Sequence, residues 1–356
     1  MSVIHFVKKY GLYLLAGLIV LIILAWPFFI NGSLDNDFNK SNFSRFFSSD
    51  NHFQKIGEPE KLIVAPSEVD NVLVFGGDIM LSRTVNKKMA TYQNYNWPLE
   101  KIATLFNEAD LAIANLESPF LLDSKYEVQT GSFSFKADPK SVAALSLAGL
   151  DILSLANNHI LNQGVKGLKD TYKILEEAKI SYVGTKDARL VINDSKNIRF
   201  AFLAYSYDST SPLVSKLDTK QLALDIKEAR AQADVVIILM HAGTEYSREP
   251  NWQQKEFARA AVDDGADLVV GHHPHWPQII EDYQGKKIIY SLGNLVFDQM
   301  WSKETSEGLV VKAYFKNKTL DHLDYIPIVI EDYGQAVVMP AGEAKEKMLK
   351  NIKVKD

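Results

Sequence analysis

The chain has 356 residues, of which 47% are hydrophobic and 23% charged, and its formal net charge at pH 7 is −5. This composition excludes an intrinsically disordered chain, and the negative charge gives no indication of a general nucleic-acid-binding protein. The sequence has no cysteine, which excludes disulfides, thiolate metal sites, a cysteine nucleophile and a lipid-modified cysteine. Histidine, carboxylate, amide and hydroxyl groups remain for metal binding and catalysis.

The first element predicted along the chain is a transmembrane helix over residues 10–30, a run of 21 residues without a charged side chain. That length crosses a bilayer, whereas the apolar core of a signal peptide usually has about 7–15 residues. Two lysines precede the run and two aspartates follow it, so the positive-inside rule predicts a cytoplasmic stub at 1–9 and an outward-facing remainder. We therefore expect a single-pass protein of the plasma membrane with an extracellular C-terminal domain.

Residues 31–70 are rich in Asn, Ser and Asp and keep no hydrophobic period, which predicts a tether. From residue 71 onward short apolar runs alternate with amphipathic stretches, so we expect one domain over 71–356. Strand–helix alternation with nearly continuous apolar strands is typical of an α/β sheet covered by helices. The predicted strands lie at 72–75, 111–114, 152–155, 198–205, 235–240, 268–270 and 287–291. Helices are predicted from Pro139, at 165–175 and at 257–262, and further strands, partly antiparallel, at 308–339.

Six of these apolar runs lead directly into acids, amides or imidazoles. In α/β folds ligands bind beyond the carboxyl ends of the strands, where loops direct side chains to a common point. Singly, each signal is weak, because an acid after a strand is often part of a turn and a lone histidine is often a hydrogen-bonded core residue. The ordered set predicts a shared site. Five of the eight histidines follow strands in this way: His159, His241, His272, His273 and His275.

Carboxylate, amide and imidazole ligands without thiolate suit divalent Mn, Fe, Zn or Mg. Six candidate ligands are too many for one catalytic zinc and suit two ions about 3.5–4 Å apart. Such a pair lowers the pKa of a shared water and supplies hydroxide at neutral pH. His159 is then free to act as a general acid or to stabilise a developing oxyanion. The candidate ligands are Asp78, Glu117, Asn158, His241, His273 and His275.

The same residues carry a family resemblance. The series Gly77-Asp78, Asn115-x-Glu117, Asn157-Asn158-His159, His241 and Gly271-x-His273-x-His275 resembles the motif set of the calcineurin-like metallophosphoesterases. The segments GGDIML, ANLESP, LANNH, HAGTEY, GHHPHWPQ and YSLGNLVFDQ are similar to the CapA family of capsule-synthesis proteins. This family is associated with poly-γ-glutamate production and usually has an N-terminal membrane anchor. The similarity runs from about residue 71 to 298, within a motif core of 71–300.

The resemblance implies a four-layer αββα sandwich with a dinuclear site at one edge. It implies that Asp78 binds the first metal, that Glu117 takes the place of the bridging acid, and that His159 is the catalytic histidine. Asn158 and His241 would bind the second metal, and His273 and His275 would each complete one metal. Weaker candidates for substrate contact or support of the site are Ser82, Arg83, Asn115, Asn157, His272, Glu245, Asn294 and Asp298.

Two positions depart from the family pattern. The wider superfamily has a histidine two residues after the first aspartate, where this chain has Met80. The first metal therefore loses a ligand, which leaves one ion or two as alternatives. The family often has a tryptophan after the histidine of the fourth motif, where this chain has Ala242, and we expect this change to alter a pocket wall.

Three functions follow as hypotheses for the whole chain. The first is a membrane-anchored, metal-dependent hydrolase of poly-γ-glutamate capsule synthesis or export, acting on a phosphoester or a γ-glutamyl amide. The second is a non-catalytic accessory protein that binds and guides the polymer beside a membrane synthase, and a weaker third is a tethered binding module. The expected partners are an anionic substrate or polymer, the membrane and a synthase complex, and not nucleic acid.

Overall fold

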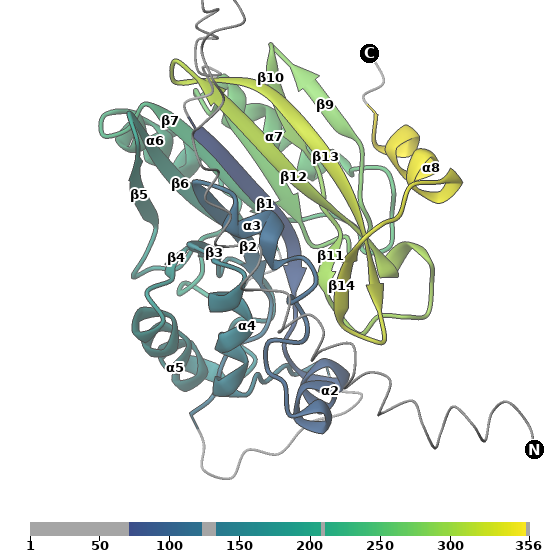
Figure 1. Ribbon diagram of the computed structural model, residues 1–356. Coiled ribbons are helices and arrows are strands. Elements are labelled where there is room, and N and C mark those ends of the chain that lie inside the picture. Colours follow the sequence, from purple (N-terminus) through teal and green to yellow (C-terminus); the bar gives the residue numbers. More distant parts are fainter. Residues whose placement is uncertain (1–70, 123–132, 208–210, 354–356) are drawn as a thin grey trace, which may run out of the picture. The chain divides into compact units, whose positions relative to one another are not determined.

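The computed structural model describes residues 71–122, 133–207 and 211–353, all within one compact unit, Val64–Asp356. The predicted stub, anchor and tether lie outside these residues. In the described ranges no helix is long and apolar enough to cross a membrane. Two β-sheets form the centre of the unit, and helices lie against them (Figure 1).

The first sheet has eight strands in the order β14-β13-β12-β1-β2-β3-β4, and β11 also pairs with β1. The strands β1, β2, β3 and β4 are parallel, whereas β12, β13 and β14 form antiparallel pairs. Strand β11 pairs in parallel with the end of β1, where Asp78 lies opposite Asn294. The strands are β1 (Asn71–Ile79), β2 (Leu111–Leu116), β3 (Ile152–Ser154), β4 (Ser181–Val183), β11 (Asn294–Val296), β12 (Glu307–Lys316), β13 (Thr319–Glu331) and β14 (Gln335–Val338).

The second sheet has six strands in the order β5-β6-β7-β8-β10-β9. Its four central strands are parallel, and an antiparallel strand closes each edge. The strands are β5 (Leu190–Ser195), β6 (Ile198–Ser206), β7 (Val235–His241), β8 (Leu268–His272), β9 (Ile280–Tyr283) and β10 (Lys286–Ile289).

Side-chain alternation along β7 shows how the layers pack, because successive residues of a strand point to opposite faces. Val235, Ile237 and Leu239 belong to the core shared with the first sheet. Val236 and Ile238 belong to a second core, which includes the apolar faces of α6 and α7. The two sheets therefore pack face to face, and α6 and α7 cover the outer face of the second sheet.

Helices α3 and α5 contact β2 and β4 of the first sheet, on the side opposite α6 and α7 (Figure 1). Asn251 and Gln254 form a capping box at the start of α7, and Asp218 accepts hydrogen bonds from the first turn of α6. The helices are α2 (Arg83–Tyr92), α3 (Ala103–Asn107), α4 (Val142–Leu147), α5 (Gly164–Glu177), α6 (Thr219–Arg230), α7 (Trp252–Asp263) and α8 (Glu343–Ile352), with 3₁₀ turns at Pro139–Ser141 and Glu304–Ser306.

The predicted α/β class is confirmed as a mixed α/β fold with two sheets. Every predicted strand and helix is present, and the stretch predicted from Pro139 opens with a 3₁₀ turn before α4 begins. Strands β4, β5, β9 and β11 were not predicted. Of these, β4, β9 and β11 have only three or four residues, a run that carries too little periodicity. Helices α2, α3, α6 and α8 were not predicted either. Three of them, α2, α6 and α8, carry many charged side chains.

Candidate metal centre

The carboxyl ends of β1, β2, β3, β7 and β8 meet at one edge of the two sheets, where polar side chains from the first sheet contact those from the second. Each strand leads into at least one of the polar residues singled out above. Gly77 allows the end of β1 to approach the neighbouring backbone, because a Cβ at this position would lie 2.0 Å from the Gly293 carbonyl oxygen. Asp78 is placed by this close approach, and its own N–H donates to the same carbonyl at 3.0 Å.

The first group of candidate ligands is Asp78, Glu117 and His275, which are all buried. One ligand atom from each residue lies within 4.8 Å of the other two. The Nδ1 atom of His275 is 3.5 Å from Oδ2 of Asp78, and its Nε2 atom is 3.9 Å from Oε1 of Glu117. Two carboxylates and one imidazole therefore face one small volume.

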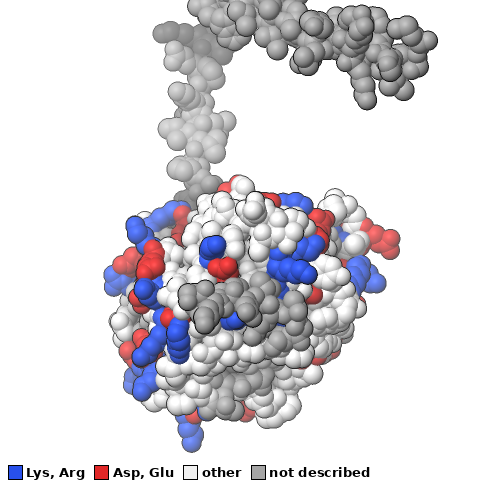
Figure 2. Space-filling view, turned by 90° about the horizontal axis from the view of Figure 1, so that it is seen from below, with Lys and Arg blue, Asp and Glu red and all other residues white. Residues whose placement is uncertain are grey.

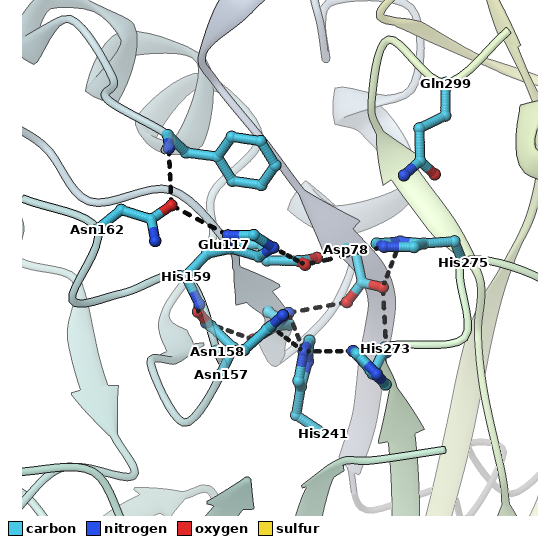
Figure 3. A network of polar contacts seen from close by, with 12 residues as sticks. Asp78, Glu117, Asn157, Asn158, His159, Asn162, His241, His273, His275 and Gln299 are labelled. Atoms are coloured by element: carbon cyan, nitrogen blue, oxygen red, sulfur yellow. Dashed lines mark hydrogen bonds and ion pairs between the residues drawn. The ribbon is translucent and has the colours of Figure 1, made fainter. Parts of the chain in front are cut away.

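The second group is Asn158, His241 and His273. The Nε2 atom of His241 lies 3.0 Å from Oδ1 of Asn158 and 3.1 Å from Nδ1 of His273. In Figure 3 these three side chains lie below Asp78. An amide oxygen and two imidazole nitrogens thus converge in the way that ligands of a divalent ion converge.

Asn115 and Asn157 connect the two groups. The amide nitrogen of Asn115 donates to Asp78 Oδ1 at 2.8 Å and lies 3.3 Å from Nδ1 of His241. Asn157 donates to Asn115 Oδ1 at 3.2 Å and accepts from the backbone N–H of His159 at 3.1 Å. These two amides hold the ends of β1, β2 and β3 together beneath the candidate ligands.

His159 lies beside the first group, with its Nε2 atom 3.7 Å from Oε1 of Glu117. Its Nδ1 atom is 3.0 Å from Oδ1 of Asn162, and its ring lies 4.1 Å from that of Phe135. Because Asn162 offers an acceptor, we assign the ring proton to Nδ1, so Nε2 carries the lone pair toward Glu117.

The segment His273-Pro274-His275 directs its two imidazoles to different neighbours. Both histidines adopt left-handed backbone angles, with φ of 98° and 61°. Such φ values are costly for residues other than glycine and persist where the surrounding structure enforces them. His273 reaches toward His241, while the Nδ1 atom of His275 lies 2.9 Å from Oδ1 of Asn294.

Asn294 in turn is held by residues that the sequence did not indicate. Its amide nitrogen donates to Gln299 Oε1 at 3.1 Å and to the Thr305 carbonyl at 2.9 Å. Gln299 donates to the hydroxyl of Tyr246 at 3.4 Å, and Tyr246 stacks on His275 with ring centres 6.0 Å apart. Tyr246 lies 53 positions from Gln299, so no spacing in the sequence could have revealed that contact.

The two carboxylates of the first group have opposite pKa shifts. Burial raises the pKa of Asp78, but the hydrogen bond to His275 and the charges of His272 and His241 outweigh it and hold this pKa below its usual range. For Glu117, burial and then the charge of Asp78 hold the pKa well above its usual range. Burial also lowers the pKa of His241 well below its usual range and that of His159 to about 4.

The weaker candidates differ in burial and in the residues that they contact. Arg83 is buried, pairs with Asp298 and lies against the rings of Phe135 and Phe297 at 4.9 and 5.7 Å. It is therefore not the solvated surface arginine that a lone Arg usually is. Glu245 is exposed, and its charge acts on Glu117 and His159.

His272, Ser82 and Met80 have local bonding partners. His272 Nε2 lies 3.2 Å from the Gly76 carbonyl and so links β8 to β1. Ser82 Oγ accepts from the Lys136 N–H at 3.0 Å. The sulfur of Met80 accepts from the Ser82 N–H at 3.1 Å, so it serves the turn before α2. Met80 therefore adds no ligand to the first group, which consists of Asp78, Glu117 and His275.

The residues present fit divalent cations. Both carboxylate oxygens of Glu117 are buried and accept no hydrogen bond from the described residues. A buried carboxylate without partners costs folding free energy, and a cation between Glu117, Asp78 and His275 would supply the missing interaction. The histidine and carboxylate donor set suits Mn, Fe, Zn or Mg.

Known proteins are similar to this chain in sequence or in fold. The chain is 32% identical over 275 residues to the capsule biosynthesis protein CapA of Bacillus anthracis, a match that covers 72% of this chain and 66% of that protein. It is 32% identical over 278 residues to the PGA biosynthesis protein CapA of Bacillus subtilis, covering 74% and 73%. Among solved structures, a phosphatase from Mycoplasma pneumoniae shares the fold with a TM-score of 0.50 at 15% identity, over 79% of this chain and 96% of that one.

The model of the bacterial capsule synthesis protein family PGA_cap matches residues 72–299. This range begins in β1, ends after β11 and includes every candidate ligand. The CapA resemblance stated from the sequence motifs is confirmed by this match and by the two Bacillus relatives. The chain belongs to the bacterial capsule synthesis protein family.

Proposed function

We propose that this protein is a metal-dependent hydrolase that acts in the synthesis or export of a poly-γ-glutamate capsule, on a phosphoester or a γ-glutamyl amide. The observation that carries the proposal is the pair of buried carboxylate oxygens of Glu117, which lie beside Asp78 and His275 and have no hydrogen-bond partner among the described residues. The assignment of the polymer rests on the similarity to the two capsule-synthesis relatives. The assignment of the reaction class rests on the donor set.

The proposed ligand sets are the two groups of three residues around Asp78. Asp78, Glu117 and His275 would hold one divalent ion, and Asn158, His241 and His273 a second. Ions of this kind supply an activated water and neutralise negative charge that develops on a phosphoryl or carbonyl oxygen. Asn115, which donates to Asp78, and Asn294, which orients His275, keep the ligands in place.

His159 is the proposed catalytic residue. With its proton held at Nδ1 by Asn162, the Nε2 lone pair faces Glu117 and so the proposed site of the first metal. This nitrogen can accept a proton there and return it to the leaving group. Phe135 packs against the ring and limits its rotation.

The proposal extends to the whole chain. We propose that residues 10–30 anchor the protein in the plasma membrane, that 31–70 form the tether, and that 71–356 act outside the cell. A domain held at the outer surface would meet the polymer as it leaves a membrane synthase.

The full-length chain, purified in detergent, tests the proposal. We expect bound divalent metal by mass spectrometry and metal-dependent hydrolysis of a generic phosphodiester or of a γ-glutamyl oligomer. Asn158→Ala should lower the metal content, and His159→Ala should slow hydrolysis roughly 10²–10⁴-fold while keeping the metal. His322→Ala is the matched control, because this histidine is exposed and pairs with Asp321 on β13.

The outcomes distinguish a hydrolase from a non-catalytic accessory protein. Metal binding without hydrolysis of either substrate, together with normal polymer formation by His159→Ala in cells, would favour the accessory protein that guides the polymer. A chain that binds no divalent metal would contradict the hydrolase.

A further inference from the structure

We infer that Tyr246 contacts the substrate at the first group of ligands, where its hydroxyl donates a hydrogen bond to an anionic oxygen of the group under attack. The nature of the reaction rests on the proposed function. Negative charge develops on such an oxygen when water attacks either a phosphoester or an amide carbonyl. Tyr246 would thus supply a donor at the first group, in addition to the proton acceptor that His159 supplies.

The loop after β7 brings Tyr246 back to the metal centre. Its backbone N–H donates to the carbonyl of Pro274, the residue between two of the histidine ligands, at 2.9 Å. Gln278 fixes the next part of the loop, since its amide nitrogen donates to the carbonyls of Ser247 and Glu249 at 2.9 and 3.2 Å. Tyr246 has a left-handed φ of 59°, which persists in a residue other than glycine only where its surroundings enforce it. The loop therefore holds Tyr246 in place before a substrate binds.

The ring of Tyr246 lies between two aromatic neighbours. It stacks on the ring of His275 with an angle of 28° between the planes. On its other side it meets the ring of Trp301 edge to face, with ring centres 6.0 Å apart. His275 belongs to the first group, whereas Trp301 is 61% exposed. The ring therefore extends from the first group toward the surface, and phenylalanine would preserve both ring contacts.

The hydrogen bond from Gln299 leaves the proton of the Tyr246 hydroxyl available. The amide nitrogen of Asn294 donates to Gln299 Oε1 at 3.1 Å, which sets the orientation of the Gln299 amide. Gln299 therefore presents its own amide nitrogen to Tyr246 and donates to the phenol oxygen at 3.4 Å. Because the phenol oxygen accepts in this bond, its O–H donates elsewhere.

Without a substrate, the acceptor for this proton is Glu245. Burial, and then the charge of Glu245 and the hydrogen bond to it, raise the pKa of Tyr246 above its usual range, so the phenol is protonated at neutral pH. Glu245 is exposed, and water can therefore take over its hydrogen bonds. An anionic oxygen at the first group would replace this carboxylate as the acceptor, after rotation of the hydroxyl about its C–O bond. The exchange leaves no buried group without a partner.

Tyr246 and His159 approach the first group from different sides. In Figure 3 His159 lies on one side of Glu117 and Gln299 on the other. Gln299 is the hydrogen-bond partner of Tyr246, so the hydroxyl of Tyr246 is on this second side. The charge of Glu117 contributes to the raised pKa of Tyr246, so the hydroxyl lies within electrostatic range of the first group. One bound group can therefore give a proton to His159 and accept a hydrogen bond from Tyr246.

Basic side chains leave this contact to the hydroxyl. On the face drawn in Figure 2, lysine and arginine side chains lie beside acidic ones. The arginines that follow β1 and β7 are both paired, Arg83 with Asp298 and Arg248 with Glu304. Their guanidinium groups are therefore already engaged, whereas the proton of Tyr246 is shared only with a solvated carboxylate.

The variant Tyr246→Phe in the full-length, metal-loaded chain tests the contact, because it removes the hydroxyl and keeps the ring. We expect kcat for the substrate that the wild type hydrolyses to fall about 10²-fold, with KM and metal content near wild type. Inorganic phosphate, a tetrahedral oxyanion, should bind the variant about tenfold more weakly in isothermal titration calorimetry. The control Tyr283→Phe removes a hydroxyl that contacts Asp263 from the edge strand β9, and it should match the wild type in all these measurements.

Unchanged phosphate affinity in Tyr246→Phe, equal losses in the control, or no phosphate binding by the metal-loaded wild type would overturn the inference. A lowered metal content in Tyr246→Phe would overturn it too, since it would show that the hydroxyl acts only by supporting His275 through Gln299 and Asn294. A wild type that hydrolyses nothing would contradict the proposed hydrolase alone. Weaker phosphate binding by Tyr246→Phe in that case would still support the contact with an anionic oxygen.

Discussion

The Nε2 atom of His275 lies 3.9 Å from Oε1 of Glu117, and both residues are buried. Two ligands of one ion with bonds of about 2.1 Å are separated by roughly 3.0–3.6 Å, so a small closure of this gap would form a coordination site. Without a cation, the Glu117 carboxylate has no hydrogen-bond partner among the described residues. Burying this carboxylate therefore costs folding free energy, and a bound metal would offset that cost.

Replacing Glu117 tests this cost directly. We expect Glu117→Gln to unfold at a higher temperature than the wild type when both are free of metal, because a neutral amide is cheaper to bury than a carboxylate. With metal at about 100 times the Kd of each site, each bound ion should add about 2.7 kcal/mol, so the wild type with two ions should gain more than the variant, which keeps only the ion of the second group. Thermal unfolding with EDTA and with Mn²⁺ measures both effects, and a variant that gains as much as the wild type would contradict the assignment.

The raised pKa of Glu117 predicts a pH dependence for the metal-free chain. Its folded-state pKa lies above the unfolded value, so its contribution to stability is present below about pH 4.5 and is lost as pH rises through the folded pKa. Because the lowered pKa values of His159 and His241 act in the opposite direction, the effect of Glu117 is a loss of stability with rising pH relative to Glu117→Gln, by at most about 1.4 kcal/mol per pH unit. Asp78 has a lowered pKa and stays ionised over this window, so it adds no slope.

Denaturant unfolding between pH 5 and 8 provides the measurement. As the pH rises from 5 to 8, the metal-free wild type should lose free energy of unfolding relative to Glu117→Gln. Saturating metal should remove this difference. Parallel curves for the two proteins without metal would be inconsistent with a raised pKa at Glu117.

Asn162 provides a test of the orientation of His159. Replacing it by alanine removes the acceptor that holds the Nδ1 proton, so Nε2 is no longer fixed in its acceptor form. We expect kcat to fall about tenfold with KM and metal content near wild type, against roughly 10²–10⁴-fold for His159→Ala. Steady-state kinetics with metal analysis distinguishes this positioning role from a loss of the ligands, which would lower the metal content.

The buried pair of Arg83 and Asp298 makes a prediction about stability. Removing one partner leaves the other charge buried, so Asp298→Leu should destabilise the fold by about 3–5 kcal/mol. The double variant Arg83→Met/Asp298→Leu should recover much of this loss, because no charge is then stranded. If Arg83 instead contacts an anionic substrate, the double variant will be stable but will show a raised KM, and the two readouts separate these roles.

The candidate ligands could be predicted from the sequence because each follows an apolar strand, and parallel strands end at the same edge. His241 and Asn158 are 83 positions apart, yet β3 and β7 place them 3.0 Å from each other. The contacts of Tyr246 and Gln299 could not be predicted, since they depend on how loops from different sheets fold back. The structural role of Arg83 was hidden for the same reason, because its partners Phe135 and Asp298 come from distant loops.

The strands predicted best were the long apolar ones, such as β6 and β7, whose burial on both faces leaves a continuous hydrophobic run. Strand β11 was not predicted, because it has only three residues. It nevertheless places Asn294 opposite Asp78. The catalytic and metal-binding roles of the individual residues stay predictions until metal is measured.

Metal stoichiometry in the full-length protein tests the central claim most directly. Mass spectrometry of the purified chain should find two divalent ions per wild-type molecule, and one fewer in each of the variants Glu117→Gln and Asn158→Ala, while His322→Ala retains both. A wild type that binds no divalent ion, or a metal content that neither substitution lowers, would contradict the account.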